Sequence, residues 1–403
     1  MVRYYSIAVL LLLSFSHFVQ AGGSVYSANG LGETLVAGGA RAIGLGGGGL
    51  ALADSHGANF SNPALIALVP GAQVRLGGHL AYWSTKSGGI TDTDAETDWQ
   101  TFYLAFPLTS AWKVGFGLLP VRRMDVRTFG WQELANQSYE ERIRIYGGEA
   151  EAQFASGLAL SPHFSAGLAI GYAFRRSERW TTVDFVSSDW QDAEFHFDDT
   201  WRGWAVTLGA LYEVHPKLSL GLIFRSRQQG NWVTRFSYIH QDSVAESEES
   251  GEGPGEWGVG IAWKVAAGWV LVADGRSGLW KTGDLGPRDP RTPVSPLWLS
   301  AGVERLARGE AHGSPLQKWG YRAGIFYRQQ HWPEQNGEKV VDLGGAVGLS
   351  IPAPAQRGAI HLAAEVGRRG SEKFGALETF TRFTLMVELN EQWFQRSKPR
   401  IPQ

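Results

Sequence analysis

Ten charged side chains are the residues best suited to bind a ligand, because they fall among small residues on one face of alternating segments. They are Arg175, Arg225, Arg322, Arg328, Arg382, Glu149, Glu151, Glu304, Glu365 and Glu388. Opposite charges on a shared face most simply pair with one another and hold neighbouring segments together. A guanidinium group can instead bind a carboxylate through two charge-assisted hydrogen bonds. Arg225 and Arg328 are our candidates for that role, because they lie toward the segment ends where a ligand would enter.

Catalytic and metal-binding patterns are absent from the sequence. The ten histidines form no close pair, and His79 and His361 lie in alternating segments where we expect them to fill polar space. The chain has no cysteine, so disulfides and thiolate metal ligands are excluded. Acidic stretches at 92–98, 189–199 and 246–256 lack the spacing of a calcium-binding loop, and we expect them to be solvated. We therefore expect no enzyme activity, no cofactor and no metal.

Apolar residues alternate with small or polar residues along almost the whole chain, in segments of about ten residues. Between 164 and 175, Phe164, Leu168 and Ile170 share one face, whereas glycine, alanine and serine dominate the other. In a soluble sandwich the second face would meet water and carry more charge. Small residues suit the crowded lumen of a membrane barrel better. We therefore predict an all-β transmembrane barrel rather than a large secreted β-sandwich.

Connection lengths support a barrel of about fourteen antiparallel strands, because short turns alternate with long polar loops. The expected strands are near 72–83, 98–107, 111–124, 138–160, 164–179, 199–214, 218–229, 254–265, 267–277, 295–307, 317–330, 338–352, 356–369 and 376–391. The expected long loops are near 84–97, 125–137, 180–198, 230–253, 278–294 and 331–337. An even number of strands places both chain ends on the short-turn side, which is periplasmic in bacterial outer-membrane barrels.

Composition and the N-terminus agree with an exported membrane protein. Charged residues make up 19% of the chain, below the quarter that is usual in soluble proteins. Acidic and basic residues are nearly balanced, 39 against 37, so no basic excess points to nucleic acid. Residues 1–21 combine a positive charge at Arg3 with a short apolar run and Val19-Gln20-Ala21, which predicts a cleaved signal peptide rather than a buried helix. No apolar run reaches the roughly 20 residues of a membrane-spanning helix.

Residues 22–71 differ from the barrel segments, because they are rich in glycine and alanine and alternate poorly. Their glycine cluster lacks the lysine and the spacing of a phosphate-binding loop. Proline restricts the residue before it and suits the first turn of a helix. The pair Asn62-Pro63 therefore predicts a turn followed by a short helical stretch at 64–67.

Two parts of this segment resemble the N-terminal signature of the FadL family of outer-membrane hydrophobe transporters, which includes TodX-type channels. The matching residues are Gly39, Arg41, Gly44, Asp54, Asn62, Pro63 and Ala64, together with small residues between them. The resemblance implies a barrel plugged by a small N-terminal hatch, with an opening in its wall through which apolar substrates pass into the membrane. PorV-type barrels of secretion systems share this signature, so the resemblance also admits a scaffold.

These observations define a domain plan and a first expected function. The plan is a signal peptide at 1–21, a hatch at 22–71, a barrel at 72–394 and a periplasmic tail at 395–403 in the bacterial outer membrane. The tail is a departure, since many such barrels end on an aromatic residue. We expect passive uptake of hydrophobic or amphipathic small molecules, such as long-chain fatty acids or aromatic hydrocarbons. The partners would be that ligand, outer-membrane lipid and lipopolysaccharide, with no nucleic acid.

The alternative is a PorV-like scaffold or shuttle barrel, which would bind a partner in a protein secretion system. A transporter needs a continuous apolar pocket sized for its ligand. The lumen of a scaffold can instead be filled by the hatch and by side chains. A plain aqueous porin is disfavoured, because the glycine-rich segment would obstruct it.

Overall fold

The computed structural model describes residues 23–28, 31–53, 60–134, 137–187, 189–238, 244–286, 289–307, 314–334, 337–354 and 357–391. The predicted signal peptide, the predicted periplasmic tail and Asp54 of the signature lie outside these ranges. Within the described ranges, no helix is both long and apolar enough to cross a membrane.

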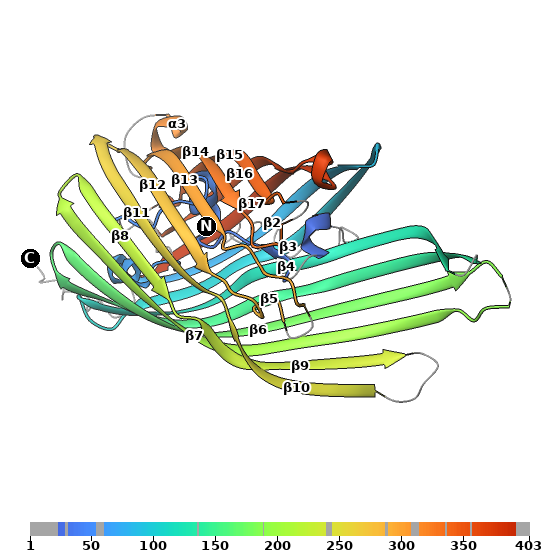
Figure 1. Ribbon diagram of the computed structural model, residues 1–403. Coiled ribbons are helices and arrows are strands. Elements are labelled where there is room, and N and C mark those ends of the chain that lie inside the picture. Colours follow the sequence, from blue (N-terminus) through green and yellow to red (C-terminus); the bar gives the residue numbers. More distant parts are fainter. Residues whose placement is uncertain are drawn as a thin grey trace, which may run out of the picture.

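The described strands form one closed antiparallel barrel of fourteen strands (Figure 1). Its wall is made of β2 (Ala72–Ser87), β3 (Ile90–Pro107), β4 (Trp112–Leu134), β5 (Gln137–Ser161), β6 (Phe164–Phe185), β7 (Ala193–His215), β8 (Leu218–Arg225), β9 (Gln228–Tyr238), β10 (Val244–Gly253), β11 (Gly255–Ala266), β12 (Trp269–Leu279), β13 (Leu297–Arg305), β14 (Gly320–Gln329), β15 (Val341–Pro352), β16 (Gly358–Gly370) and β17 (Leu377–Glu391). The barrel closes where β17 pairs with β2. The predicted fourteen-strand antiparallel barrel is therefore confirmed.

Two of the fourteen wall strands are interrupted, and the interruptions lie on neighbouring strands. One strand continues from β8 into β9 across 226–227, and the next continues from β10 into β11 across Pro254. Proline has no N–H to donate to a β-ladder, so it commonly marks a bend or an edge. Beyond the breaks, β9 and β10 pair with each other while β9 also pairs with β7. Strands β9 and β10 thus form a hairpin that extends the wall past the barrel rim (Figure 1).

The apolar face of each strand points outward and the small or polar face points inward. Along β6, Phe164, Leu168 and Ile170 are exposed, whereas Ser165 and Ala169 between them are buried. An outward apolar surface with a polar interior is the arrangement that a lipid environment requires of a barrel. Trp257, Trp263 and Trp269 are examples of exposed aromatic side chains near strand ends. This position suits the headgroup layers of a bilayer.

The structure corrects four of the predicted long loops, because most of their residues belong to strands. Residues 84–97, 125–137, 180–198 and 230–253 continue β2–β7, β9 and β10 into long hairpins that extend one rim of the barrel (Figure 1). These extensions mix apolar and polar side chains without a regular alternation: Ile90, Phe129 and Trp131 are exposed among polar neighbours, so the sequence pattern did not reveal strands there. The connections at 278–294 and 331–337 are mostly irregular, as predicted.

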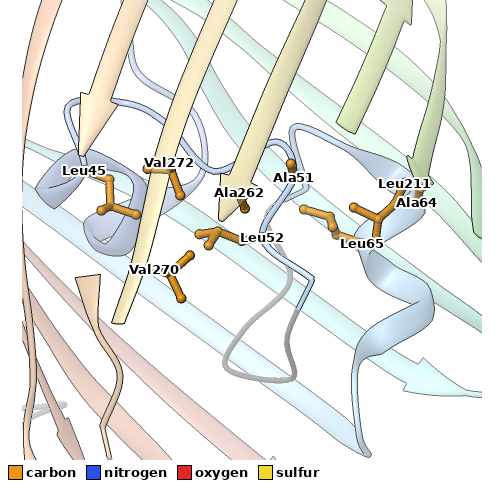
Figure 2. Packing of buried hydrophobic residues seen from close by; sticks show 9 residues of the cluster. All are labelled: Leu45, Ala51, Leu52, Ala64, Leu65, Leu211, Ala262, Val270 and Val272. Carbon is orange, nitrogen blue, oxygen red and sulfur yellow. The ribbon is translucent and has the colours of Figure 1, made fainter. Parts of the chain in front are cut away.

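The N-terminal segment packs inside the barrel. It contains the 3-10 helix η2 (Val25–Ala28), the short strand β1 (Glu33–Thr34), the helix α2 (Gly39–Gly44) and the 3-10 helix η3 (Pro63–Leu68). Five of its apolar residues pack on inward residues of β7, β11 and β12 (Figure 2). They are Leu45, Ala51, Leu52, Ala64 and Leu65. The remaining short helices, α3 (Pro315–Lys318) and η5 (Glu372–Phe374), lie in connections between wall strands.

Candidate functional site

The Asn62-Pro63-Ala64 element begins η3 and fixes it against the barrel wall. The Asn62 side-chain oxygen accepts a hydrogen bond from the Ala64 N–H at 3.1 Å. Its amide nitrogen donates to the backbone oxygens of Leu50, at 2.8 Å, and Ala210, at 3.2 Å. Pro63 occupies the first helical position, where its missing N–H is not needed. One asparagine thus joins the helix start, the preceding loop and strand β7.

Close approach to the wall depends on glycine. A side-chain carbon built at Gly167 of β6 would lie 2.2 Å from the Pro63 carbonyl carbon. At Gly39, which begins α2 with a φ of +73°, such a carbon would collide with the Met386 side chain of β17. The structure therefore places the signature glycine Gly39, like Asn62 and Pro63, at a contact between the N-terminal segment and the wall. Gly44 is likewise packed against Arg322 and Gly348.

Ion pairs add a second set of links between the N-terminal segment and the wall. Arg41 binds Glu304 of β13 through Nε and Nη2, at 3.0 and 2.6 Å. The carboxylate of Glu304 also accepts from Arg322 Nη2 at 2.9 Å. All three side chains are buried. Buried guanidinium–carboxylate pairs are costly to break, since the remaining charge has no water to replace its partner.

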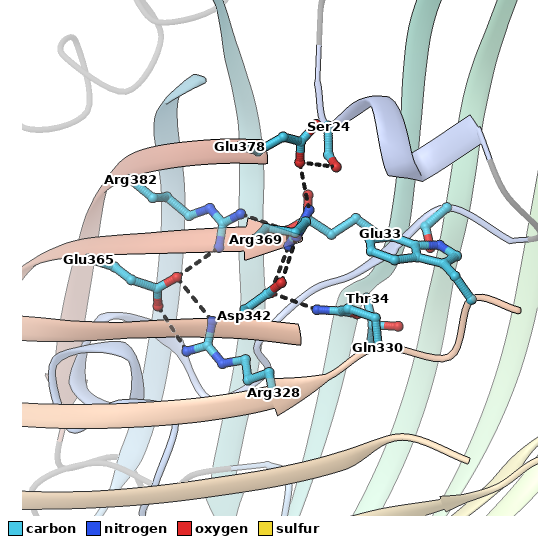
Figure 3. Close-up of polar contacts among 12 residues, drawn as sticks. Ser24, Glu33, Thr34, Arg328, Gln330, Asp342, Glu365, Arg369, Glu378 and Arg382 are labelled. Carbon is cyan, nitrogen blue, oxygen red and sulfur yellow. Dashed lines mark hydrogen bonds and ion pairs between the residues drawn. The ribbon is translucent and has the colours of Figure 1, made fainter. Parts of the chain in front are cut away.

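The largest such network surrounds Glu33 (Figure 3). The Glu33 carboxylate accepts hydrogen bonds from Arg369 Nη2 at 2.7 Å and from Arg382 Nη2 at 3.0 Å. Arg369 also pairs with Asp342 at 2.7 Å. Burial alone would raise the pKa of the Glu33 carboxyl, but Arg369 and Arg382 outweigh burial and lower it to about 2. Glu33 is therefore ionised at neutral pH and ties the N-terminal segment to β16 and β17.

The wall contains a seam between β3 and β4. The ladder between them runs from Pro107–Lys113 to Phe102–Leu118 and then stops. Both strands continue beyond this point, and the structure describes all of residues 90–134. Pro120 follows on β4 at a register shift against β5, and proline cannot donate to a ladder. The wall hydrogen bonds between β3 and β4 are thus missing on the side of the long hairpins.

The N-terminal segment occupies the free edge of β4 at this seam. Glu33 and Thr34 of β1 pair with Arg123 and Arg122 of β4. The Leu35 N–H donates to the Val121 oxygen at 2.9 Å, which continues the same ladder. Residues 33–35 therefore replace β3 as the neighbour of β4.

Arg123 links the two sides of the seam through its side chain. It donates to Asp98 Oδ2 of β3 at 2.9 Å and lies 3.4 Å from Glu96. Asp98 and Glu96 belong to the acidic stretch 92–98, which we expected to be solvated. Glu96 is instead buried and faces the lumen.

A cavity of about 160 Å³ lies in the lumen beside the seam. Thr34 and Leu35 line it from the N-terminal segment, and residues 119–122 line it from β4. Charged side chains from four further wall strands and two tryptophans are also part of the lining. They are Arg225, Glu151, Glu256, Arg276, Trp280 and Trp298. The cavity is therefore small, partly aromatic and partly charged.

The two arginine candidates occupy different places. Arg225 lines the cavity and pairs with Glu151 through two hydrogen bonds. Arg328 is not among the cavity residues; it pairs with Glu365 at 2.9 and 3.0 Å and donates to the Gly46 oxygen at 3.3 Å. Among the described residues both arginines thus have carboxylate partners within the protein. Only Arg225 is placed to meet a molecule in the cavity.

Two features of the site were not predicted from the sequence. The pairing of β1 with β4 rests on two residues, too few for any alternation to reveal. His331, in the connection after β14, stacks on Trp280 with ring centroids 4.3 Å apart. Burial, followed by the positive charges of Arg122 and Arg175, lowers the pKa of His331 well below its ordinary value. His331 is therefore neutral beside the cavity.

The fold and the filled lumen define a transmembrane β-barrel of the FadL type. The structure is similar to a FadL homologue from Pseudomonas aeruginosa, with a TM-score of 0.62, 12% identity and coverage of 90% of this chain and 99% of that one. It is also similar to the toluene transporter TodX of P. putida, with a TM-score of 0.60, 15% identity and coverage of 90% and 100%. The toluene transporter TbuX of Ralstonia pickettii gives a TM-score of 0.58, 13% identity and coverage of 88% and 99%.

The chain belongs to the BamG family, whose sequence model matches residues 1–247 and 300–399. No curated protein matches the sequence. At 12–15% identity the likeness to the three channels is one of fold. It confirms the FadL-type resemblance that the N-terminal signature predicted.

Proposed function

We propose that this protein is an outer-membrane channel for passive uptake of small hydrophobic or amphipathic molecules. The N-terminal segment would act as its hatch, and ligand would leave sideways through the seam between β3 and β4. TodX and TbuX, which share the fold, are toluene transporters, and this supports the choice of ligand class. The concentration gradient and the partitioning of ligand into the membrane would drive the flux, so the transport requires no energy source.

One observation carries the proposal: residues 33–35 lie between the cavity and the seam. Thr34 and Leu35 line the cavity on one side, while the same residues form the ladder with β4 on the other. Moving residues 33–35 would break a few backbone hydrogen bonds with β4. The cavity would then open to the seam between β3 and β4. A hatch that seals a seam in this way couples ligand capture to lateral exit.

The size of the cavity favours small ligands over long chains. An engineered cavity of roughly 150 Å³ takes up benzene, so 160 Å³ suits a single ring. A long-chain fatty acid would require the hatch to move before the chain could be buried. Burial of each CH₂ group is worth about 0.8 kcal/mol, so a long apolar chain would contribute more to that larger movement than a single ring does.

A binding experiment on the purified barrel tests the proposal. Labelled toluene and a labelled long-chain fatty acid are offered in a detergent that is too bulky to enter the lumen. We expect saturable toluene binding that is lost in Ile223→Trp, which fills the cavity, and kept in Val259→Trp, which changes a lipid-facing residue. Heat-modifiable migration on a gel verifies that both variants are folded.

Absence of saturable binding of either ligand by the folded wild-type barrel would overturn the channel and favour the scaffold. One observation supports that second candidate: the lumen is largely filled by the N-terminal segment and by ion pairs rather than by a continuous apolar pocket. The long hairpins of β4–β7, β9 and β10 would then provide a docking surface for a secreted protein. Co-purification of a stable partner, lost when the hairpins are shortened, would support the scaffold.

A further inference from the structure

The lining of the cavity is richer in polar groups than a hydrocarbon site requires. Three guanidinium groups line it: Arg122 pairs with Glu149 behind the lining and Arg225 with Glu151, whereas Arg276 lies 3.6 Å from the third carboxylate, Glu256. A purely apolar ligand would gain nothing from these charges and would separate them from other polar groups. The lining therefore points to a ligand with its own charge.

Several buried polar atoms of this lining have no hydrogen-bond partner among the described residues. The donors are Arg122 Nε, Arg276 Nη2 and Trp298 Nε1, and the acceptors are Gln153 Oε1 and Glu256 Oε1. Arg122 and Gln153 are 7% and 4% exposed, so their side chains are more than nine-tenths buried. Buried polar groups normally find partners, and donors predominate here. The missing partner is therefore chiefly a hydrogen-bond acceptor.

Arg276 is the cation with the weakest internal partner. Its Nη1 lies 3.6 Å from Glu256 Oε1, beyond hydrogen-bond distance, whereas Arg225 is held by two hydrogen bonds to Glu151. The neighbouring carboxylate on β12, Asp274, instead accepts the N–H groups of Gly49 and Leu50 at 2.6 and 2.9 Å. Arg276 thus retains the capacity to bind a carboxylate from a ligand.

Aromatic rings supply the apolar part of the same cavity. Trp280 and Trp298 both line it, and the Arg122 guanidinium lies 5.0 Å from the centre of the Trp280 ring. Aromatic side chains stack readily with planar rings. A volume of about 160 Å³ accepts one ring beside the guanidinium groups.

We infer that the cavity binds a small carboxylate whose apolar body is about the size of one benzene ring. This inference rests on the proposed function and narrows its ligand class from hydrophobic molecules to small amphipathic acids. The carboxylate would bind Arg276 and the free donors of Arg122 and Trp298, while the ring would lie against Trp280. Selectivity against the hydrocarbon follows, because toluene leaves those donors without partners.

Equilibrium dialysis of the purified full-length barrel with labelled benzoate and labelled toluene tests the inference. We expect wild type to bind benzoate more tightly than toluene. Arg276→Gln should weaken benzoate binding by about 10- to 100-fold, as loss of a hydrogen bond to a charged group predicts, and leave toluene nearly unchanged. Arg276→Lys should retain part of the affinity, because it keeps the charge. Arg235→Gln, which breaks an exposed ion pair with Glu246 on the projecting hairpin, is the matched control.

The outcomes separate this inference from the proposed function. Toluene binding equal to or tighter than benzoate binding, unaffected by Arg276→Gln, would overturn the carboxylate site and leave the hydrophobe channel standing. The same holds if Arg276→Gln and Arg235→Gln weaken benzoate equally. If folded wild-type protein binds neither compound nor a long-chain fatty acid, the channel itself fails.

Discussion

Glu33 attaches the N-terminal segment to the barrel through both its side chain and its backbone. Its carboxylate joins Arg369 and Arg382 inside the barrel, and its backbone pairs with Arg123 at the seam. The same residue therefore holds the N-terminal segment to the far wall by charge and to β4 by hydrogen bonds. Movement of residues 33–35 away from β4 would break both kinds of contact.

The depressed pKa of Glu33 makes the attachment of the N-terminal segment dependent on pH. Because its pKa in the folded protein is about 2, below the ordinary value of 4.5, its contribution to stability is complete above pH 4.5 and is lost as pH falls toward 2. The shift corresponds to about 3 kcal/mol. The protection factors of the amides of residues 31–37, which correct for the intrinsic pH dependence of exchange, should fall over this pH range in wild type. In Glu33→Gln these protection factors should already be low at pH 7, and wild-type protection at pH 7 in that variant would contradict this role.

Gly167 offers a second test at the scale of one residue. Gly167→Val should displace η3, because its new side-chain carbon would meet the Pro63 backbone at 2.2 Å. We expect a loss of about 1–3 kcal/mol in stability and an increase in single-channel conductance in planar bilayers. Gly275→Val is the control, since its nearest neighbour is the Leu299 side chain at 3.5 Å. Equal conductance in the two variants would show that η3 does not obstruct the bore.

At the scale of elements, alternation predicted the strands within the membrane and failed beyond it. Side chains that face lipid must be apolar, and those that face the crowded lumen must be small or polar. Successive residues of a wall strand therefore alternate, and this alternation made every wall strand recognisable. No such contrast exists along the hairpin extensions, and residues 84–97 and 230–253 were therefore taken for loops. The strand β1 was missed because its partner on β4 is distant in sequence and its length is two residues.

The sequence predicted which kinds of charged residue face the lumen, but it did not predict which of them pair with one another. Alternation correctly placed Arg225 and Arg328 on the inward face with glutamates. Which arginine meets which glutamate depends on the register between strands, which a single sequence does not reveal. Arg276 was not singled out, because its importance arises from the cavity and from the distance to Glu256.

The projecting hairpin of β9 and β10 should be dispensable for barrel closure. Among described strands, β10 pairs with β9, and Thr234 lies opposite Ser247 beyond the buried Trp232, at a point where the hairpin can be shortened. Replacing residues 235–246 with a two-residue turn should leave the heat-modifiable barrel and toluene binding unchanged, because Trp232 keeps its contacts with Leu31 and Trp201. Loss of the folded form would show instead that the hairpin supports the wall.

The barrel wall as a whole is continuously hydrogen-bonded except at the seam between β3 and β4. Thirteen of its neighbouring strand pairs are hydrogen-bonded along most of their shared length, whereas β3 and β4 separate beyond Phe102–Leu118. The N-terminal segment fills that gap and also borders the cavity. The central claim is that this segment moves away from β4 when ligand passes.

A disulfide between residues 35 and 121 tests this claim most directly. The chain has no cysteine, and the Leu35–Val121 hydrogen bond brings the two backbones within reach of a disulfide. In vesicles containing Leu35→Cys/Val121→Cys, toluene uptake should be blocked under oxidising conditions and restored by a reductant. Ala273→Cys/Ala301→Cys, which joins two strands that are already paired, should have no effect in either condition. Uptake by the oxidised Leu35→Cys/Val121→Cys protein at the rate of the reduced protein would contradict the account.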